Sequence, residues 1–233
     1  TYQKELNWDM VQSEAGRFIE LALGPDGTVP EDFAVYQQNA ILQILVRQTE
    51  DAQKMMSRGE VDEAARQFNM AADGFLEYLE NYDNIDDDEY ANLLLSAGNF
   101  YTDGGNLERA NDVYKQYVDR FPGKKASRAL LFDIATNYQN ALELEEAIRY
   151  FDILYKQTAG KGIEYAGAAN ALYNSALLKV GLGQYQEAAE GLEFFAKKFS
   201  DDPNAEATFC MAGQYWEKVA NWRALEFYTR YLK

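Results

Sequence analysis

The chain has 233 residues, a formal net charge of −16 and no His, and 47% of its residues are hydrophobic. This composition is that of a globular protein with a buried core. So acidic a surface argues against nucleic-acid phosphates and anionic lipid as ligands, and it favours a basic partner. The commonest general base is absent, and the sequence contains no nucleophile elbow, phosphate-binding glycine loop or zinc motif,. We therefore predict a non-enzymatic protein without cofactor or metal.

A single cysteine, Cys210, excludes an intramolecular disulfide framework,. On a predicted helix it fits a small core or groove residue better than a nucleophile. No apolar run approaches the roughly 20 residues that span a bilayer, so we expect no insertion into a membrane. The sequence starts without an initiator Met, which suggests a mature form or a piece of a longer protein.

The first part of the chain contains two predicted helices. Residues 7–23 have apolar side chains at helical spacing, and a Gly- and Pro-containing break follows,. A second helix starts near Glu31. It either continues to Gly59 or breaks near Gln38 and Asn39, and the sequence leaves both alternatives open.

After Gly59, residues 61–79 present one apolar helical face,. The acidic residues 83–89 come next, directly before another predicted helix. Their carboxylates are well placed to cap its positive N-terminus.

Residues 91–124 are the clearest unit of the sequence. They predict two short helices, at about 88–103 and 106–120, with a turn at Gly105 and a stop at Pro122,. Small residues would lie where the two helices cross, and aromatic residues would lie where the pair packs. The same pattern then recurs along the chain.

Each copy has an alanine at an apolar position of its second helix, and these alanines mark equivalent positions in the copies. The spacings between successive alanines all exceed the about 34 residues of the shortest helical-hairpin repeats. The excess falls in residues 83–89 and 158–162, which therefore mark inserted loops. The registering residues are Ala64, Ala110, Ala147, Ala188 and Ala224.

This pattern resembles the tetratricopeptide repeat family over about residues 45–233; an ordinary helix bundle is the alternative. The third copy has Leu142 at the turn glycine and Ala135 at the helix-crossing glycine, and the fourth has Lys179 in place of an aromatic residue. The best copy matches at Leu94, Gly98, Tyr101, Gly105, Ala110, Tyr114 and Pro122.

The resemblance implies an all-α fold, a right-handed α-solenoid of stacked antiparallel helix pairs. Residues 45–233 would form about five repeats in one continuous domain. Residues 1–44 would form N-terminal helices that pack on the solenoid or cap it.

The resemblance also implies a scaffold or adaptor that binds a protein or peptide in a concave groove lined by the first helix of each pair. Groove amides would bond the peptide backbone and aromatic rings would hold apolar anchors, although Phe132, Tyr173 and Phe209 could instead pack between repeats. In the family's best-known pocket, Lys, Arg and Asn side chains bind the terminal carboxylate of a partner. Asn99 could be such an Asn, but the Lys and Arg residues are missing from the neighbouring positions, so this kind of pocket is not expected. The predicted groove residues are Asn92, Leu95, Asn99, Asp103, Phe132, Asp133, Thr136, Gln139, Asn140, Tyr173, Asn174, Leu177, Phe209 and Trp216.

The patterns A…Y…Y…FP and A…F…KKF also resemble tetratricopeptide proteins of the Gram-negative cell envelope. This resemblance implies a bacterial protein that is periplasmic or associated with the outer membrane, with a cytoplasmic protein as the alternative. A second functional hypothesis is a structural or self-assembling module that forms homo-oligomers through its aromatic terminal helix, residues 220–233.

Overall fold

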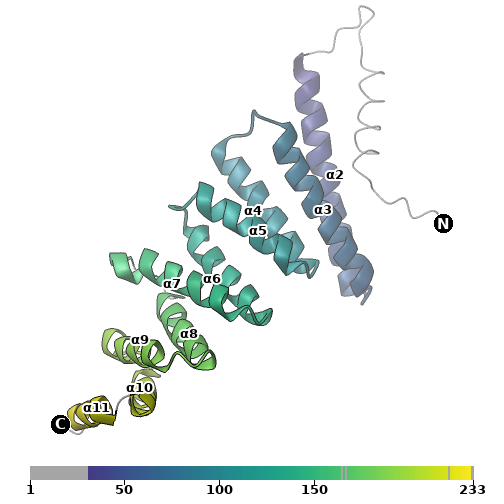
Figure 1. Cartoon of the computed structure of the whole chain (residues 1–233). Coiled ribbons are helices and arrows are strands. Elements are labelled where there is room, and N and C mark those ends of the chain that lie inside the picture. Colours follow the sequence, from purple (N-terminus) through teal and green to yellow (C-terminus); the bar gives the residue numbers. More distant parts are fainter. Residues whose placement is uncertain (1–30, 164, 166, 220, 232–233) are drawn as a thin grey trace, which may run out of the picture. The chain divides into compact units, whose positions relative to one another are not determined.

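The computed structural model describes residues 31–163, 165, 167–219 and 221–231, and the helix predicted at 7–23 lies outside these ranges. The described residues form α-helices joined by turns, with no strand among them. Successive helices pack against each other in pairs (Figure 1). The predicted all-α architecture of stacked helix pairs is therefore confirmed.

The described helices alternate between the first and the second helix of a hairpin. The first helices are α2 (Glu31–Ser57), α4 (Asp87–Asp103), α6 (Lys125–Asn140), α8 (Gly167–Gly181) and α10 (Ala205–Val219). The second helices are α3 (Val61–Asn81), α5 (Leu107–Arg120), α7 (Leu144–Gln157), α9 (Tyr185–Lys198) and α11 (Asn221–Tyr231), and a short 3-10 helix, η1 (Ala159–Lys161), follows α7.

The chain divides into two compact units, Thr1–Tyr117 and Val118–Lys233, and each is described by itself. In the first unit, α2 passes Gln38 and Asn39 without interruption, so the long-helix alternative is the one found. Its Leu45 packs against α3 at Gly74, where a Cβ would lie 2.4 Å from the leucine Cδ2. The absence of a side chain at this glycine lets the two helices approach closely.

Four hairpin turns share one backbone geometry, the Schellman motif. In each, one residue has a left-handed backbone conformation, with φ of 81° at Gly59, 72° at Gly105, 63° at Leu142 and 73° at Gly183. The following N–H donates to the carbonyl five residues earlier. These bonds are Glu60 to Met55 (3.0 Å), Asn106 to Tyr101 (2.8 Å), Glu143 to Tyr138 (2.9 Å) and Gln184 to Lys179 (2.9 Å).

The helix crossings within the hairpins also follow the predicted pattern of a small residue against a large one. In the first unit, a Cβ on Gly98 would lie 2.4 Å from the Tyr114 ring. In the second unit, a Cβ on Gly213 would lie 2.9 Å from the ring of Tyr228. The missing side chains make room for the rings, which is why these hairpins need glycine at the crossing.

A polar contact joins each of three first helices to the second helix before it. The donor lies in the last turns of the first helix, and the acceptor is a carboxylate. The three contacts are Tyr101 to Asp73, Lys179 to Asp152 (3.2 Å) and Trp216 to Glu193 (3.2 Å). Burial and the neighbouring Asp73 raise the pKa of Tyr101 to about 12, so its hydroxyl keeps the proton that it donates,.

We predict that Leu142→Gly stabilises the second unit. A left-handed conformation costs an L-residue about 1–2 kcal/mol, whereas glycine adopts it freely and loses about 0.5–1 kcal/mol through the greater entropy of its unfolded state. The expected net gain is roughly 0.5–1 kcal/mol, measured as a higher midpoint of thermal unfolding. Gly183→Leu is the reciprocal control and should lower the midpoint. A lower midpoint for Leu142→Gly would contradict this explanation.

Candidate partner-binding surfaces

The first-helix surface of the first unit begins at the cap of α4. Asp86 accepts hydrogen bonds from the N–H groups of Asp88 (2.9 Å) and Glu89 (2.8 Å). The acidic segment 83–89 therefore caps this helix, as predicted. The next turns of α4 carry Asn92, Asn99 and Asp103, which are exposed, and Leu95, which is half-buried.

Asn99 has a structural role that the sequence did not reveal. Its Oδ1 accepts a hydrogen bond from the hydroxyl of Tyr114 at 2.9 Å. The same hydroxyl lies 3.0 Å from Oγ1 of Thr102. Tyr114 thus packs its ring on Gly98 and ties its hydroxyl to two residues of α4, so Asn99 contributes both to the hairpin and to its surface.

In the second unit, α6 carries five of the predicted residues. Phe132 is half-buried and makes an edge-to-face contact with Phe151 of α7, with ring centroids 5.3 Å apart. The hydroxyl of Thr136 donates to the Phe132 carbonyl at 2.9 Å. Asp133 and Asn140 are exposed, and Gln139 is half-buried.

The predicted aromatic residues of α8 and α10 also have partners within their own hairpins. The ring of Tyr173 lies 5.5 Å from Phe195 of α9, and Phe209 stacks on Phe227 of α11 at 4.0 Å. Both first-helix rings are half-buried. Asn174 and Leu177 of α8 are half-buried as well.

Trp216 differs from the other predicted groove residues because it is only 1% exposed. It lies in the core of the second unit, with Ala212 and Leu192 in the same cluster. Its indole N–H donates to Glu193, which satisfies the polar atom of this buried ring. Trp216 therefore supports the helices that carry the surface.

Two exposed residues of the first helices, Asp103 and Asp133, have carboxyl groups that neighbouring atoms partly shield from water. Loss of water around them raises the pKa of Asp103 and of Asp133 above the ordinary value,. Neither carboxylate has an ion pair or a hydrogen bond with any residue that the structure describes. Each therefore keeps a charge that no residue in the described ranges compensates.

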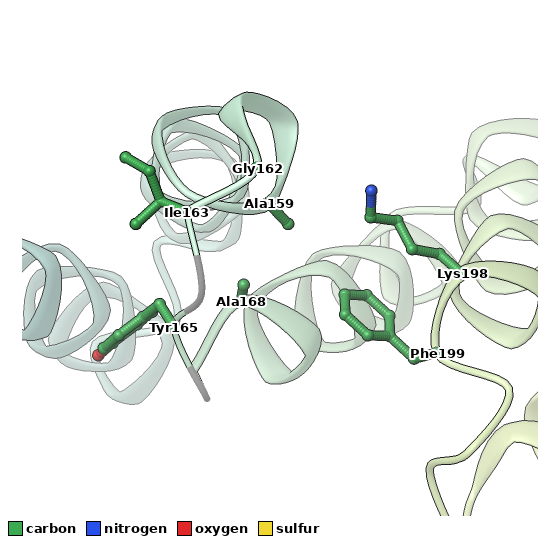
Figure 2. Close-up of a pocket in the computed structure, with 7 residues that line it drawn as sticks. All are labelled: Ala159, Gly162, Ile163, Tyr165, Ala168, Lys198 and Phe199. Carbon is green, nitrogen blue, oxygen red and sulfur yellow. The ribbon is translucent and has the colours of Figure 1, made fainter.

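A cleft of about 380 Å³ lies in the second unit, between the α7–α8 connection and the end of α9. Figure 2 shows Lys198 and Phe199 on one side of it, with Ala159 and Ala168 facing them. Gly162, Ile163 and Tyr165 complete the lining. The sequence predicted an inserted loop at 158–162 but not this cleft, because the loop and the end of α9 meet only in the folded chain.

Three further features bear on a metal site, a reactive thiol and a membrane span. No cluster of potential metal ligands occurs among them. Cys210 in α10 is half-buried and is a free thiol. No helix in the described ranges has the length and apolarity needed to cross a membrane.

The double role of Asn99 predicts a difference between two identical substitutions in α4. Asn99→Ala removes an acceptor of the Tyr114 hydroxyl and should cost about 1 kcal/mol relative to Asn92→Ala, which alters the same helix at an exposed site. Thermal or urea unfolding measures the difference. In the Asn99→Ala background, Tyr114→Phe should cost less than it does in the wild type. Equal stability of the two alanine variants would contradict the assignment.

Comparison with known proteins agrees with the fold. Residues 92–124 match the model of the tetratricopeptide repeat family. TPR-like repeats of a Podosopora anserina kinesin light chain are 17% identical, cover 80% of this chain and 92% of their own, and give a TM-score of 0.52. BtubC (BKLC) of P. vanneervenii is 14% identical, covers 94% of this chain and 86% of its own, and gives a TM-score of 0.51.

No curated protein matches the sequence. At these identities the structural likenesses establish the fold, and this fold is typical of non-catalytic scaffolds for protein–protein interaction. The predicted resemblance is confirmed. The chain has a fold similar to that of tetratricopeptide repeat proteins, and its residues 92–124 match the model of that family.

Proposed function

We propose that the chain is a non-enzymatic scaffold that binds a basic segment of a partner protein on the first-helix surface of its repeats. The observation that carries the proposal is the uncompensated carboxylate of Asp133 on α6. The predicted groove residues of the second unit also include half-exposed Phe132 and Tyr173 and the polar side chains of Gln139 and Asn174.

The energetic argument starts from the raised pKa of Asp133. A partly dehydrated carboxylate without a cation is less stable than the same group in water, so it costs the fold stability at neutral pH. A Lys or Arg of a bound segment would supply the missing charge and hydrogen bonds. The surface thus gives up stability in the free protein and recovers it on binding, as functional sites often do.

The first unit supports the same partner class by itself. Asp103 ends α4, and its pKa is also raised by loss of water. Exposed Asn92 and Asn99 lie on the same helix, where amides can bond a peptide backbone,. A basic partner is further favoured by the net charge of −16, because long-range attraction accelerates encounter.

We predict that Asp133→Asn weakens binding of a basic peptide and at the same time stabilises the protein. The probe is a fluorescent peptide of alternating Lys and Leu, and fluorescence polarisation should show a loss of about threefold to tenfold. The matched control is Asp201→Asn, an exposed carboxylate outside the first helices. It removes the same charge and should change binding less than twofold.

The stability effect has a defined pH dependence. Because the pKa of Asp133 is raised, its charged form opposes folding above that pKa,. Asp133→Asn should therefore raise the unfolding midpoint at pH 7, and the gain should shrink as pH falls through the pKa of Asp133. Equal loss of peptide binding in both aspartate variants would attribute the attraction to net charge alone and reject the site.

We further propose that this scaffold belongs to a bacterial cell-envelope complex. The support is the resemblance of the A…Y…Y…FP and A…F…KKF patterns to envelope proteins of this repeat type. Fractionation of the source cells tests it, and recovery of the protein with the cytoplasm alone would reject the envelope context.

A self-assembling module is the second candidate, and α11 is the feature that favours it. The helix buries Ala224 and Phe227, which are 3% and 5% exposed. On the other side it exposes Trp222 (68%) and Leu225 (70%), with Val219 of α10 at 41%. Adjacent exposed apolar side chains of this size are typical of a contact surface.

For this candidate we predict that Trp222→Ser with Leu225→Ser abolishes self-association. Size-exclusion chromatography with light scattering should give a concentration-dependent dimer for the wild-type chain and a monomer for the variant. Circular dichroism confirms that the exposed substitutions leave the helices intact. A wild-type chain that remains monomeric at all concentrations would reject this function and leave the scaffold proposal unaffected.

A further inference from the structure

We propose that the second unit has another binding site, formed by the ends of α7 and α9, which takes an apolar anchor residue flanked by acidic residues in a partner protein. We call it the α7/α9 strip, and it consists of Tyr155, Phe194, Ala159, Ala168, Lys198 and Phe199. It lies mostly on second helices and the α7–α8 connection, with Ala168 from the first turn of α8, and it contains none of the predicted groove residues.

The cleft forms one end of the strip. Its walls are mostly apolar, with Ala159 and Ala168 facing Phe199 (Figure 2). Ile163 in the same lining is 39% exposed, although it is a large aliphatic residue. A cleft of about 380 Å³ has room for one leucine or aromatic side chain with its backbone,.

An aromatic pair extends the apolar surface away from the cleft. Phe194 and Tyr155 make an edge-to-face contact with ring centroids 6.1 Å apart. Phe194 is 47% exposed, and it lies one helical turn before Lys198 on α9,. The pair formed by Phe194 and Tyr155 therefore lies next to the ammonium-bearing residue Lys198, which lines the cleft.

Lys198 lines the cleft, and two further lysines lie within three residues of the lining residue Ala159 in the sequence. Lys156 is in the last turn of α7, Lys161 in η1 and Lys198 in the last turn of α9. None of these three ammonium groups has an ion pair with a residue in the described ranges. The neighbouring Lys197, by contrast, is paired with Glu193.

Charge complementarity decides the occupant. A negative helix C-terminus accounts for lysines in the last turns, but it leaves their ammonium groups exposed and unpaired. An acidic partner segment would pair with them, and its apolar anchor would fill the cleft and cover Phe194. Apolar anchoring supplies the affinity, and the charges supply specificity and faster association.

The test is a selection of random linear peptides displayed on phage. Wild-type chain is immobilised, and the variant with Phe194→Ala and Lys198→Gln is present in solution as a competitor, so that only peptides dependent on the strip survive. We expect the enriched peptides to share one aromatic residue or leucine next to Asp or Glu. Circular dichroism and thermal unfolding check that the competitor is folded.

Fluorescence polarisation then measures the affinities of the enriched peptides. Lys198→Gln should weaken binding about fivefold and Phe194→Ala about tenfold. Lys197→Gln is the matched control, because it removes the adjacent charge, and it should change affinity less than twofold. Equal effects of the two lysine substitutions would overturn the site.

Other results would also overturn the proposal. They are a selection without enrichment, enriched peptides that lack an anchor or acidic residues, and binding to phosphatidylglycerol vesicles that depends on the strip while no peptide does. The outcome is independent of the first-helix proposal. Asp133→Asn should leave the acidic peptides bound, and the strip variants should leave the basic peptide bound.

Discussion

The repeats depend on one polar contact, in which a donor on a first helix meets a carboxylate on the second helix before it. Apolar faces between hairpins set distance but not register, because they tolerate sliding. A directional bond helps to fix the register at the three junctions where it occurs,. The donor changes from Tyr101 to Lys179 to Trp216, whereas the acceptor is always acidic. This is why Lys179 replaces an aromatic residue without loss of the repeat geometry.

The carboxylates in these contacts differ from two others of this acidic chain. Those on the second helices, such as Asp152 and Glu193, are used within the fold. Asp103 and Asp133 on the first helices have raised pKa values and no compensating cation among the described residues. Charge count alone does not separate the two groups. The helix alone does not separate them either, because Asp51 on the first helix α2 is paired with Lys54. Asp103 and Asp133 are distinguished by their own surroundings.

Local backbone chemistry was predictable from the sequence, because it depends on neighbouring residues. The cap at Asp86 and the turn at Gly105 are of this kind, and so is Leu142, which takes the left-handed conformation of the glycine it replaces. The bond from Tyr114 to Asn99 was not predictable, since it depends on how two helices cross. Trp216 was taken for a groove residue because helical spacing alone does not distinguish its buried face from an exposed one. Partner binding by the predicted groove residues stays a prediction.

The second unit would have an acidic first-helix surface and a basic α7/α9 strip, which raises the question of binding between copies. Contact between two different surfaces of the same chain builds either closed rings or open filaments. The strip, however, requires a free apolar side chain beside the acidic group. The aromatic rings of the predicted groove on α6 and α8, Phe132 and Tyr173, are already packed on Phe151 and Phe195. Withdrawing either ring would sacrifice core packing, so the two surfaces are suited to two different partners.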